Sequence, residues 1–172
     1  MTITIRNLVP ADAPAYAAFR TEMLADTPHA FTASPGDDPG QNIEGVRASL
    51  AGPNYAIVGA FDDMQQFVGV AGVNRQDKAK RAHIAWVWGV YVTPSRRGQG
   101  VARRLIAGTI QTARAWPGVE RMSLSVSATS ATARRVYESH GFIAWGTEPD
   151  ALRTGGKSYD ETYLSLDLTA HA

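Results

Sequence analysis

Val90-Tyr-Val-Thr-Pro-Ser-Arg-Arg-Gly-Gln-Gly-Val-Ala102 is the stretch that decides the fold. An apolar run over 82–92 leads into it, and a helix-like pattern follows it to about residue 115. Glycines let a backbone approach a ligand closely, and the first turn of a helix carries unpaired N–H groups and a partial positive charge. The stretch therefore predicts a phosphate or pyrophosphate site at a turn from a strand to a helix.

Two other phosphate-binding motifs fit this chain less well. The dinucleotide fingerprint G-x-G-x-x-G requires a third glycine where Arg103 stands, and it belongs to an early strand rather than a late one. Gly156-Lys157-Ser158 matches the tail of a P-loop, but Ala151 replaces its first glycine and no helical pattern follows. A glycine turn with solvated arginines is the remaining structural interpretation.

Hydrophobic periodicity predicts the elements around this stretch. The first helix places Tyr16, Phe19, Arg20 and Met23 on one face, with the arginine stem as its amphipathic member. The run over 82–92 is apolar on both faces, which favours a central strand. The order of elements indicates an α/β sheet of mixed direction with one strand-helix-strand crossover. We expect strands at 2–8, 55–61, 67–74, 82–92, 119–126, 142–147 and 158–168, helices at 12–25, 41–50, after Gly100 to about 115 and at 130–140, and loops at 26–40 and 148–157.

Composition narrows the class of protein. The 172 residues suit a single domain, 1–172, and the net charge of +1 does not suggest a nucleic-acid or membrane-surface protein. The absence of cysteine excludes a disulfide scaffold, a cysteine nucleophile and thiolate metal sites, and we expect no bound metal. We find neither a signal-peptide pattern nor a membrane-spanning run, so a cytoplasmic protein with no nucleic-acid or membrane partner is expected.

Three segments resemble the GNAT superfamily of N-acetyltransferases. Arg97–Ala102 fits its signature Arg/Gln-x-x-Gly-x-Gly/Ala, and residues 133–142 resemble its fourth-helix motif, which ends in Tyr-Glu-x-x-Gly-Phe. The opening Ile-Arg-x-Leu-x-Pro-x-Asp, residues 5–12, is similar to the family's N-terminus. The resemblance implies a mixed, mostly antiparallel central sheet of about seven strands flanked by about four helices. Ser130 departs from the family pattern, because it stands where the fourth-helix motif usually has Asn.

The resemblance also implies an activity, the transfer of an acetyl group from acetyl-CoA to a primary amine within a ternary complex. In this family the transfer is direct, so no cysteine intermediate is needed. Tyr137 is expected to assist the leaving thiolate, although a buried core tyrosine is the alternative. Main-chain groups of three strand residues would hold the pantetheine arm, and the glycine stretch would hold the pyrophosphate. The expected cofactor-binding residues are Val90, Tyr91, Val92, Arg97, Gly98, Gln99, Gly100, Val101, Ala102, Ser130 and Tyr137.

The general base is left open among several groups. Relatives often carry a Glu on the strand that corresponds to 82–92, but this strand contains no carboxylate. The candidates are His83, Glu22, Asp160, Glu161 or a water molecule.

The acceptor amine is expected between the 26–40 loop, the helix after it and the 148–157 loop, because loops on a rigid sheet carry specificity. Trp86, Trp88 and Trp145 are candidates to line this pocket or to lie in the core. The acceptor is a small molecule or a peptide, and the protein is a monomer or a homodimer. A non-catalytic acyl-CoA sensor and an enzyme for longer acyl donors are the alternative functions.

Overall fold

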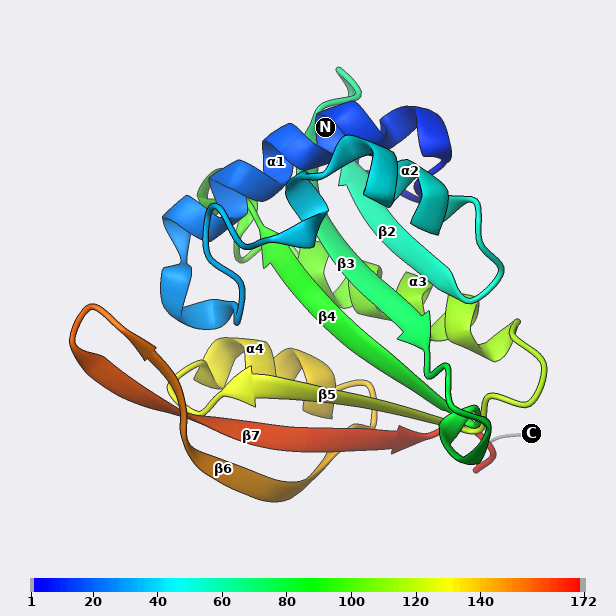
Figure 1. Cartoon of the computed structure of the whole chain (residues 1–172), viewed down its shortest axis with the longest axis vertical. Coiled ribbons are helices and arrows are strands. Elements are labelled where there is room, and N and C mark those ends of the chain that lie inside the picture. Colours follow the sequence, from blue (N-terminus) through cyan, green and yellow to red (C-terminus); the bar gives the residue numbers. More distant parts are fainter. Residues whose placement is uncertain (1, 171–172) are drawn as a thin grey trace.

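The computed structural model describes residues 2–170, which form one seven-stranded sheet in the order β1-β2-β3-β4-β5-β7-β6. Only β4 and β5 pair in parallel, and every other neighbouring pair is antiparallel (Figure 1). The strands are β1 (Thr4–Asn7), β2 (Tyr55–Phe61), β3 (Phe67–Arg75), β4 (Ile84–Val92), β5 (Arg121–Ser127), β6 (Ile143–Thr154) and β7 (Lys157–Asp167), and the helices are α1 (Ala13–Asp26), α2 (Ile43–Leu50), α3 (Val101–Arg114) and α4 (Ala131–Glu138).

Helices cover both faces of the sheet. Figure 1 shows α1 and α2 on the near face, where Tyr16, Met23 and Ile57 belong to one buried cluster. On the other face α3 and α4 bury a second cluster that includes Leu105 and Met122. The crossover from β4 through α3 to β5 is the one expected from the sequence. Within residues 2–170, no helix is both long enough and apolar enough to span a membrane.

The prediction of a loop at 148–157 is wrong, because both neighbouring strands extend into this segment. β6 and β7 remain paired as far as Thr154 and Lys157, and only Gly155-Gly156 form the turn. Both glycines have positive φ, +57° and +71°, which suits a two-residue hairpin. The proline and aspartate of this segment lie in a bulge between Glu148 and Leu152, so the pairing continues around them.

The candidate functional site lies where β4 and β5 separate. They pair only from Ile84 to Trp86 on the β4 side, and Figure 1 shows them diverging beyond that point. A bulge in β4 places Gly89 and one further residue opposite a single residue of β3. Gly89 has φ +60°, a conformation that strains any residue with a side chain, and bulges increase strand twist. The edge of β4 that faces β5 is consequently without a strand partner over 87–92.

Candidate active site

The glycine stretch forms an exposed cradle of backbone donors at the start of α3. Gly98 and Gly100 have φ +75° and +77°, and Gly100 is the N-cap of α3. The six successive N–H groups of residues 98–103 have no acceptor in the part of the chain that the structure describes. Unpaired donors at a helix N-terminus form a site for an anion, so the geometry fits the pyrophosphate site expected from the sequence.

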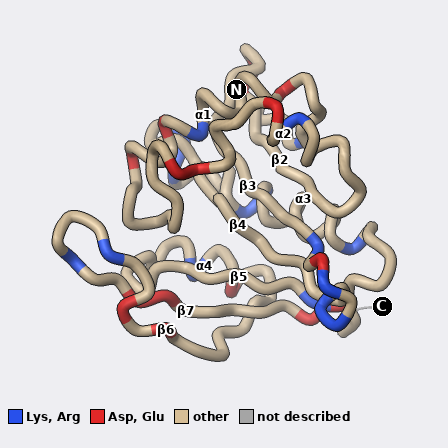
Figure 2. Tube along the Cα trace, in the orientation of Figure 1, with Lys and Arg blue, Asp and Glu red and all other residues tan. Residues whose placement is uncertain are grey.

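The arginines around this cradle differ in whether another residue binds them. Arg97 forms an ion pair with Asp26, donates from Nε to the Val92 carbonyl at 3.0 Å and lies over the Tyr91 ring. Arg104 donates to the carbonyl of residue 3 at 2.7 Å. Arg103 is exposed and has no partner among residues 2–170, which leaves its charge available at the first turn of α3. Figure 2 shows the other Lys and Arg residues scattered over many elements rather than collected on one face.

The strand residues expected to hold the pantetheine arm can offer it their backbone groups, because their side chains are buried or half-buried. Val90 and Val92 are half-buried, and Tyr91 packs edge-on against Phe19 of α1 with ring centroids 5.6 Å apart. Burial and the nearby carboxylate of Asp26 raise the pKa of Tyr91 to about 12, so its hydroxyl stays neutral. The side chain of Tyr91 therefore belongs to the near-face core, and this residue can meet a ligand only through its main chain.

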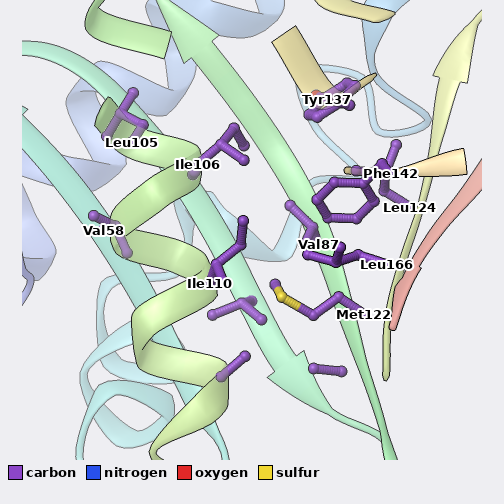
Figure 3. Packing of buried hydrophobic residues seen from close by; sticks show 14 of the residues in the cluster. Val58, Val87, Leu105, Ile106, Ile110, Met122, Leu124, Tyr137, Phe142 and Leu166 are labelled. Atoms are coloured by element: carbon purple, nitrogen blue, oxygen red, sulfur yellow. The ribbon is translucent and has the colours of Figure 1, made fainter. Parts of the chain in front are cut away.

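Tyr137 lies on the far side of the same opening. Its side chain is only 6% exposed, belongs to the core cluster beneath α3 and meets Phe142 edge-on at 6.0 Å between centroids. Figure 3 shows its ring between the ribbons of β4 and β5, above Phe142. Burial raises the pKa of the Tyr137 hydroxyl, which makes no hydrogen bond within residues 2–170. A neutral hydroxyl without a partner is a suitable donor for a developing anion.

Ser130 occupies the N-cap of α4, but its side chain does not cap the helix. The hydroxyl accepts no bond from the first turn of α4, in contrast to the usual role of an N-cap serine. Among the described residues the hydroxyl has no hydrogen-bond partner, and it lies close to the end of β5.

A cavity of about 620 Å³ lies on the near face and reaches the separated strands. Its walls come from the 30–40 segment and α2, two of the three segments expected around the acceptor, and also from β4 and β5. Trp86 and Trp88 line it, whereas Trp145 is 65% exposed outside it. The 148–157 segment does not line this cavity, and just beyond it Tyr159 of β7 stacks on His29.

A buried ion pair in the cavity wall is the feature that the sequence did not reveal. Arg20 of α1 is 6% exposed and donates to Asp38 from Nε at 2.8 Å and from Nη2 at 3.1 Å. Burial is the largest single influence and acts to lower the pKa of Arg20, but the hydrogen bond to Asp38 and the electrostatic effects of Tyr16, Asp38 and Tyr55 together raise it. In the sequence, the only indication of this pair is an arginine on the buried face of the first helix. No sequence pattern identifies Asp38 as its partner.

The four candidate bases occupy very different places. Glu161 of β7 lines the cavity, opposite Ser127 of β5 in the ladder. His83 is exposed just before β4, at the end where the strands are still paired, so it lies away from the opening. Asp160 is exposed and accepts the backbone N–H of Asp150 at 2.9 Å. Glu22 is an exposed residue of α1 and is absent from the cavity wall.

Comparison with known proteins identifies the class of protein. Residues 16–142 match the model of the acetyltransferase (GNAT) family, and the chain belongs to that family. It is 30% identical over 98 residues to the L-amino acid N-acetyltransferase AaaT of Escherichia coli, a match that covers 57% of this chain and 60% of that protein. The chain thus spans less than two thirds of this curated relative.

Solved structures share the whole fold. An acetyltransferase of the GNAT family from Streptococcus pneumoniae has a TM-score of 0.85 at 18% identity, covering 96% of this chain and 99% of that one. The acetyltransferase yncA of Salmonella typhimurium, determined with its cofactor acetyl-CoA, has a TM-score of 0.83 at 22% identity and covers 100% and 97%. The GNAT fold expected from the sequence, with its seven-stranded mixed sheet and four helices, is confirmed.

Proposed function

We propose that this protein transfers an acetyl group from acetyl-CoA to the primary amine of a small acceptor. The observation that carries the proposal is the run of six unpaired N–H groups at residues 98–103 beside the open edge of β4. These groups fit a diphosphate, and an unpaired strand edge fits the amides of a pantetheine arm. The relative from Escherichia coli is named as an amino-acid N-acetyltransferase, which supports the same chemistry.

Bound acetyl-CoA would supply the thioester, and the reaction forms a C–N bond, breaks the C–S bond and moves one proton from the amine to the sulfur. Arg103 would add a positive charge beside the backbone cradle. Tyr137 would donate a hydrogen bond to the developing thiolate. Because burial raises the pKa of Tyr137 further above that of a thiol, ~8.5, complete proton donation is less favourable than a hydrogen bond.

Glu161 is the base that the cavity favours. A lysine-like amine has a pKa of ~10.4, so about 4.6 kcal/mol is needed to present it neutral at pH 7. Glu161 is the candidate carboxylate that lines the acceptor cavity, where it would hold the ammonium and take its proton directly or through water. A cavity of about 620 Å³ suits a small amine or the terminus of a peptide.

The decisive experiment is a screen of acceptor amines with acetyl-CoA, in which release of free thiol is measured. Amine-dependent thiol release is expected. Calorimetric binding of acetyl-CoA without transfer to any amine would favour the sensor function, and preference for a longer acyl-CoA would change the donor. The cytoplasmic location and the choice between monomer and homodimer remain predictions from the sequence.

A further inference from the structure

The acceptor cavity contains one buried hydrogen-bond donor that no residue uses. The Nη1 group of Arg20 is fully buried and has no partner within residues 2–170, although Nε and Nη2 of the same guanidinium are bound by Asp38. Phe31 covers the guanidinium, with Cζ 5.3 Å from its ring centroid. Buried donors without partners are rare in native proteins, so this one calls for a ligand atom.

The residues packed around the free donor belong to the wall of the cavity. Arg20, Phe31 and Asp38 all line the cavity, and so does Gly89 at the bulge of β4. A Cβ atom added to Gly89 would lie 3.1 Å from Nη1, which places this nitrogen against the strand at the opening. The donor therefore lies where an acceptor molecule would approach the separated strands.

We propose that Arg20 Nη1 binds a carboxylate or carbonyl oxygen of the acceptor, which makes the acceptor an amino acid or an amino-acid amide rather than a simple alkyl amine. The proposal rests on the function proposed above and names its substrate class. Asp38 fixes the guanidinium by two bonds, so the third direction is preset for the ligand. Glu161, the third charged residue of the cavity wall beside Arg20 and Asp38, would meet the amine.

The site should discriminate between acceptors with and without such an oxygen, because leaving this donor unpaired is unfavourable. In the free protein, Phe31 and the strand at Gly89 shield Nη1. An acceptor that occupies the cavity without supplying an oxygen leaves a buried cationic donor unsatisfied. An oxygen-bearing acceptor should therefore exceed its analogue in kcat/KM by about 10- to 100-fold.

The test compares three acceptors that share a side chain: methionine, methioninamide and 3-(methylthio)propylamine. Similar sets from phenylalanine and 4-aminobutanoate extend the comparison to other shapes and spacings. We expect the acid or the amide to exceed the oxygen-free amine by at least about tenfold, and the acid-to-amide ratio distinguishes carboxylate from carbonyl recognition. Equal use of all three members in every set would overturn the proposal.

Arg20→Lys is the matched variant, because lysine keeps a cation for Asp38 but cannot offer the forked third donor. The preference should fall to within about twofold of unity, while calorimetric affinity for acetyl-CoA is unchanged. Arg6→Lys is the control, since Arg6 is bound by Asp12 at 2.7 and 2.9 Å outside this cavity. This control should keep the wild-type preference, and loss of preference in both variants would contradict the assignment to Arg20.

Product binding separates this inference from the proposed activity. Calorimetry of the wild-type protein saturated with CoA should show tighter binding of N-acetylmethionine than of N-acetyl-3-(methylthio)propylamine. Such a difference without thiol release would sustain the binding site and refute the activity. Thiol release without such a difference would refute the site and sustain the activity, and this measurement holds even where Arg20→Lys does not fold.

Discussion

Arg97, in the glycine stretch, forms an ion pair with Asp26, the last residue of α1. The pair holds the pKa of Asp26 below its ordinary value, mainly through the hydrogen bond from the guanidinium. It thereby joins the proposed pyrophosphate cradle to the helix that carries Arg20. The same contact occupies the one arginine that the GNAT signature places in the loop.

Asp26→Asn tests whether this carboxylate competes with the cofactor for Arg97. The variant should bind acetyl-CoA about two- to fivefold more tightly, because it removes a negative charge and weakens an exposed ion pair. Calorimetry at two salt concentrations measures the effect, which should shrink at high salt. Weaker binding would instead mean that the pair holds the loop in its binding conformation.

Gly100→Ala tests the cradle itself. A Cβ here meets no protein atom within 4 Å, but φ +77° makes it strained, so about 1 kcal/mol of unfolding free energy should be lost. Affinity for acetyl-CoA should also fall by about tenfold, because the methyl group enters the space of the ligand. Gly118→Ala is the control, with φ +76° at a site between α3 and β5. Equal losses of affinity in both variants would count against the cradle.

Tyr137→Phe tests the proposed donor to the thiolate. We expect kcat to fall by about 10- to 100-fold with little change in acetyl-CoA affinity. The hydroxyl has no partner among the described residues, so denaturation should show less than about 0.5 kcal/mol of change in stability. Because burial raises the pKa of Tyr137, its ionisation should cause no loss of wild-type kcat up to about pH 10.

Phe142→Leu is the companion to that variant, because it disturbs the same packing without removing a hydroxyl. Its stability should fall while kcat of the folded protein is kept. An equal fall of kcat in both variants would show that Tyr137 has only a structural role.

Glu161→Gln tests the proposed base. Its kcat/KM should be lowest relative to the wild type near neutral pH, and the deficit should shrink as pH rises toward the pKa of the acceptor amine. The reason is that free amine then forms in solution without help from the protein. Asp160→Asn is the neighbouring control, because that carboxylate binds the backbone of Asp150 instead. A deficit that does not depend on pH would leave Glu161 a binding role only.

Asp12 provides a test of stability against pH. The hydrogen bond from Arg6 lowers the pKa of Asp12 from 3.8, so the pair stabilises the fold above that pH. This contribution is lost as the pH falls through the lower pKa of the folded state. Arg6 is 38% exposed, so Asp12→Asn should cost only about 0.5–1 kcal/mol at pH 7. Urea denaturation should show the difference from wild type vanish well below pH 3.8, and a constant difference would contradict the pKa shift.

Much of the fold could be predicted because its signals are local. The glycines before α3 need positive φ, and the apolar run of β4 needs a central place in the sheet, so both are visible in a short window of sequence. The hairpin at Gly155-Gly156 was missed because Pro149 and Asp150 resemble a loop locally. The pairing of β6 with β7 on either side accommodates them in a bulge.

The sequence by itself determined the family, the proposed phosphate cradle and the candidate tyrosine, because each depends on residue type at a fixed spacing along one segment. Only the tertiary structure decided the acceptor side. It placed Glu161 on the cavity wall and His83 at the paired end of β4. It also joined Arg20 to Asp38 across 18 positions and left one donor free. Such contacts depend on how helix, loop and sheet pack together, and no local pattern encodes that packing.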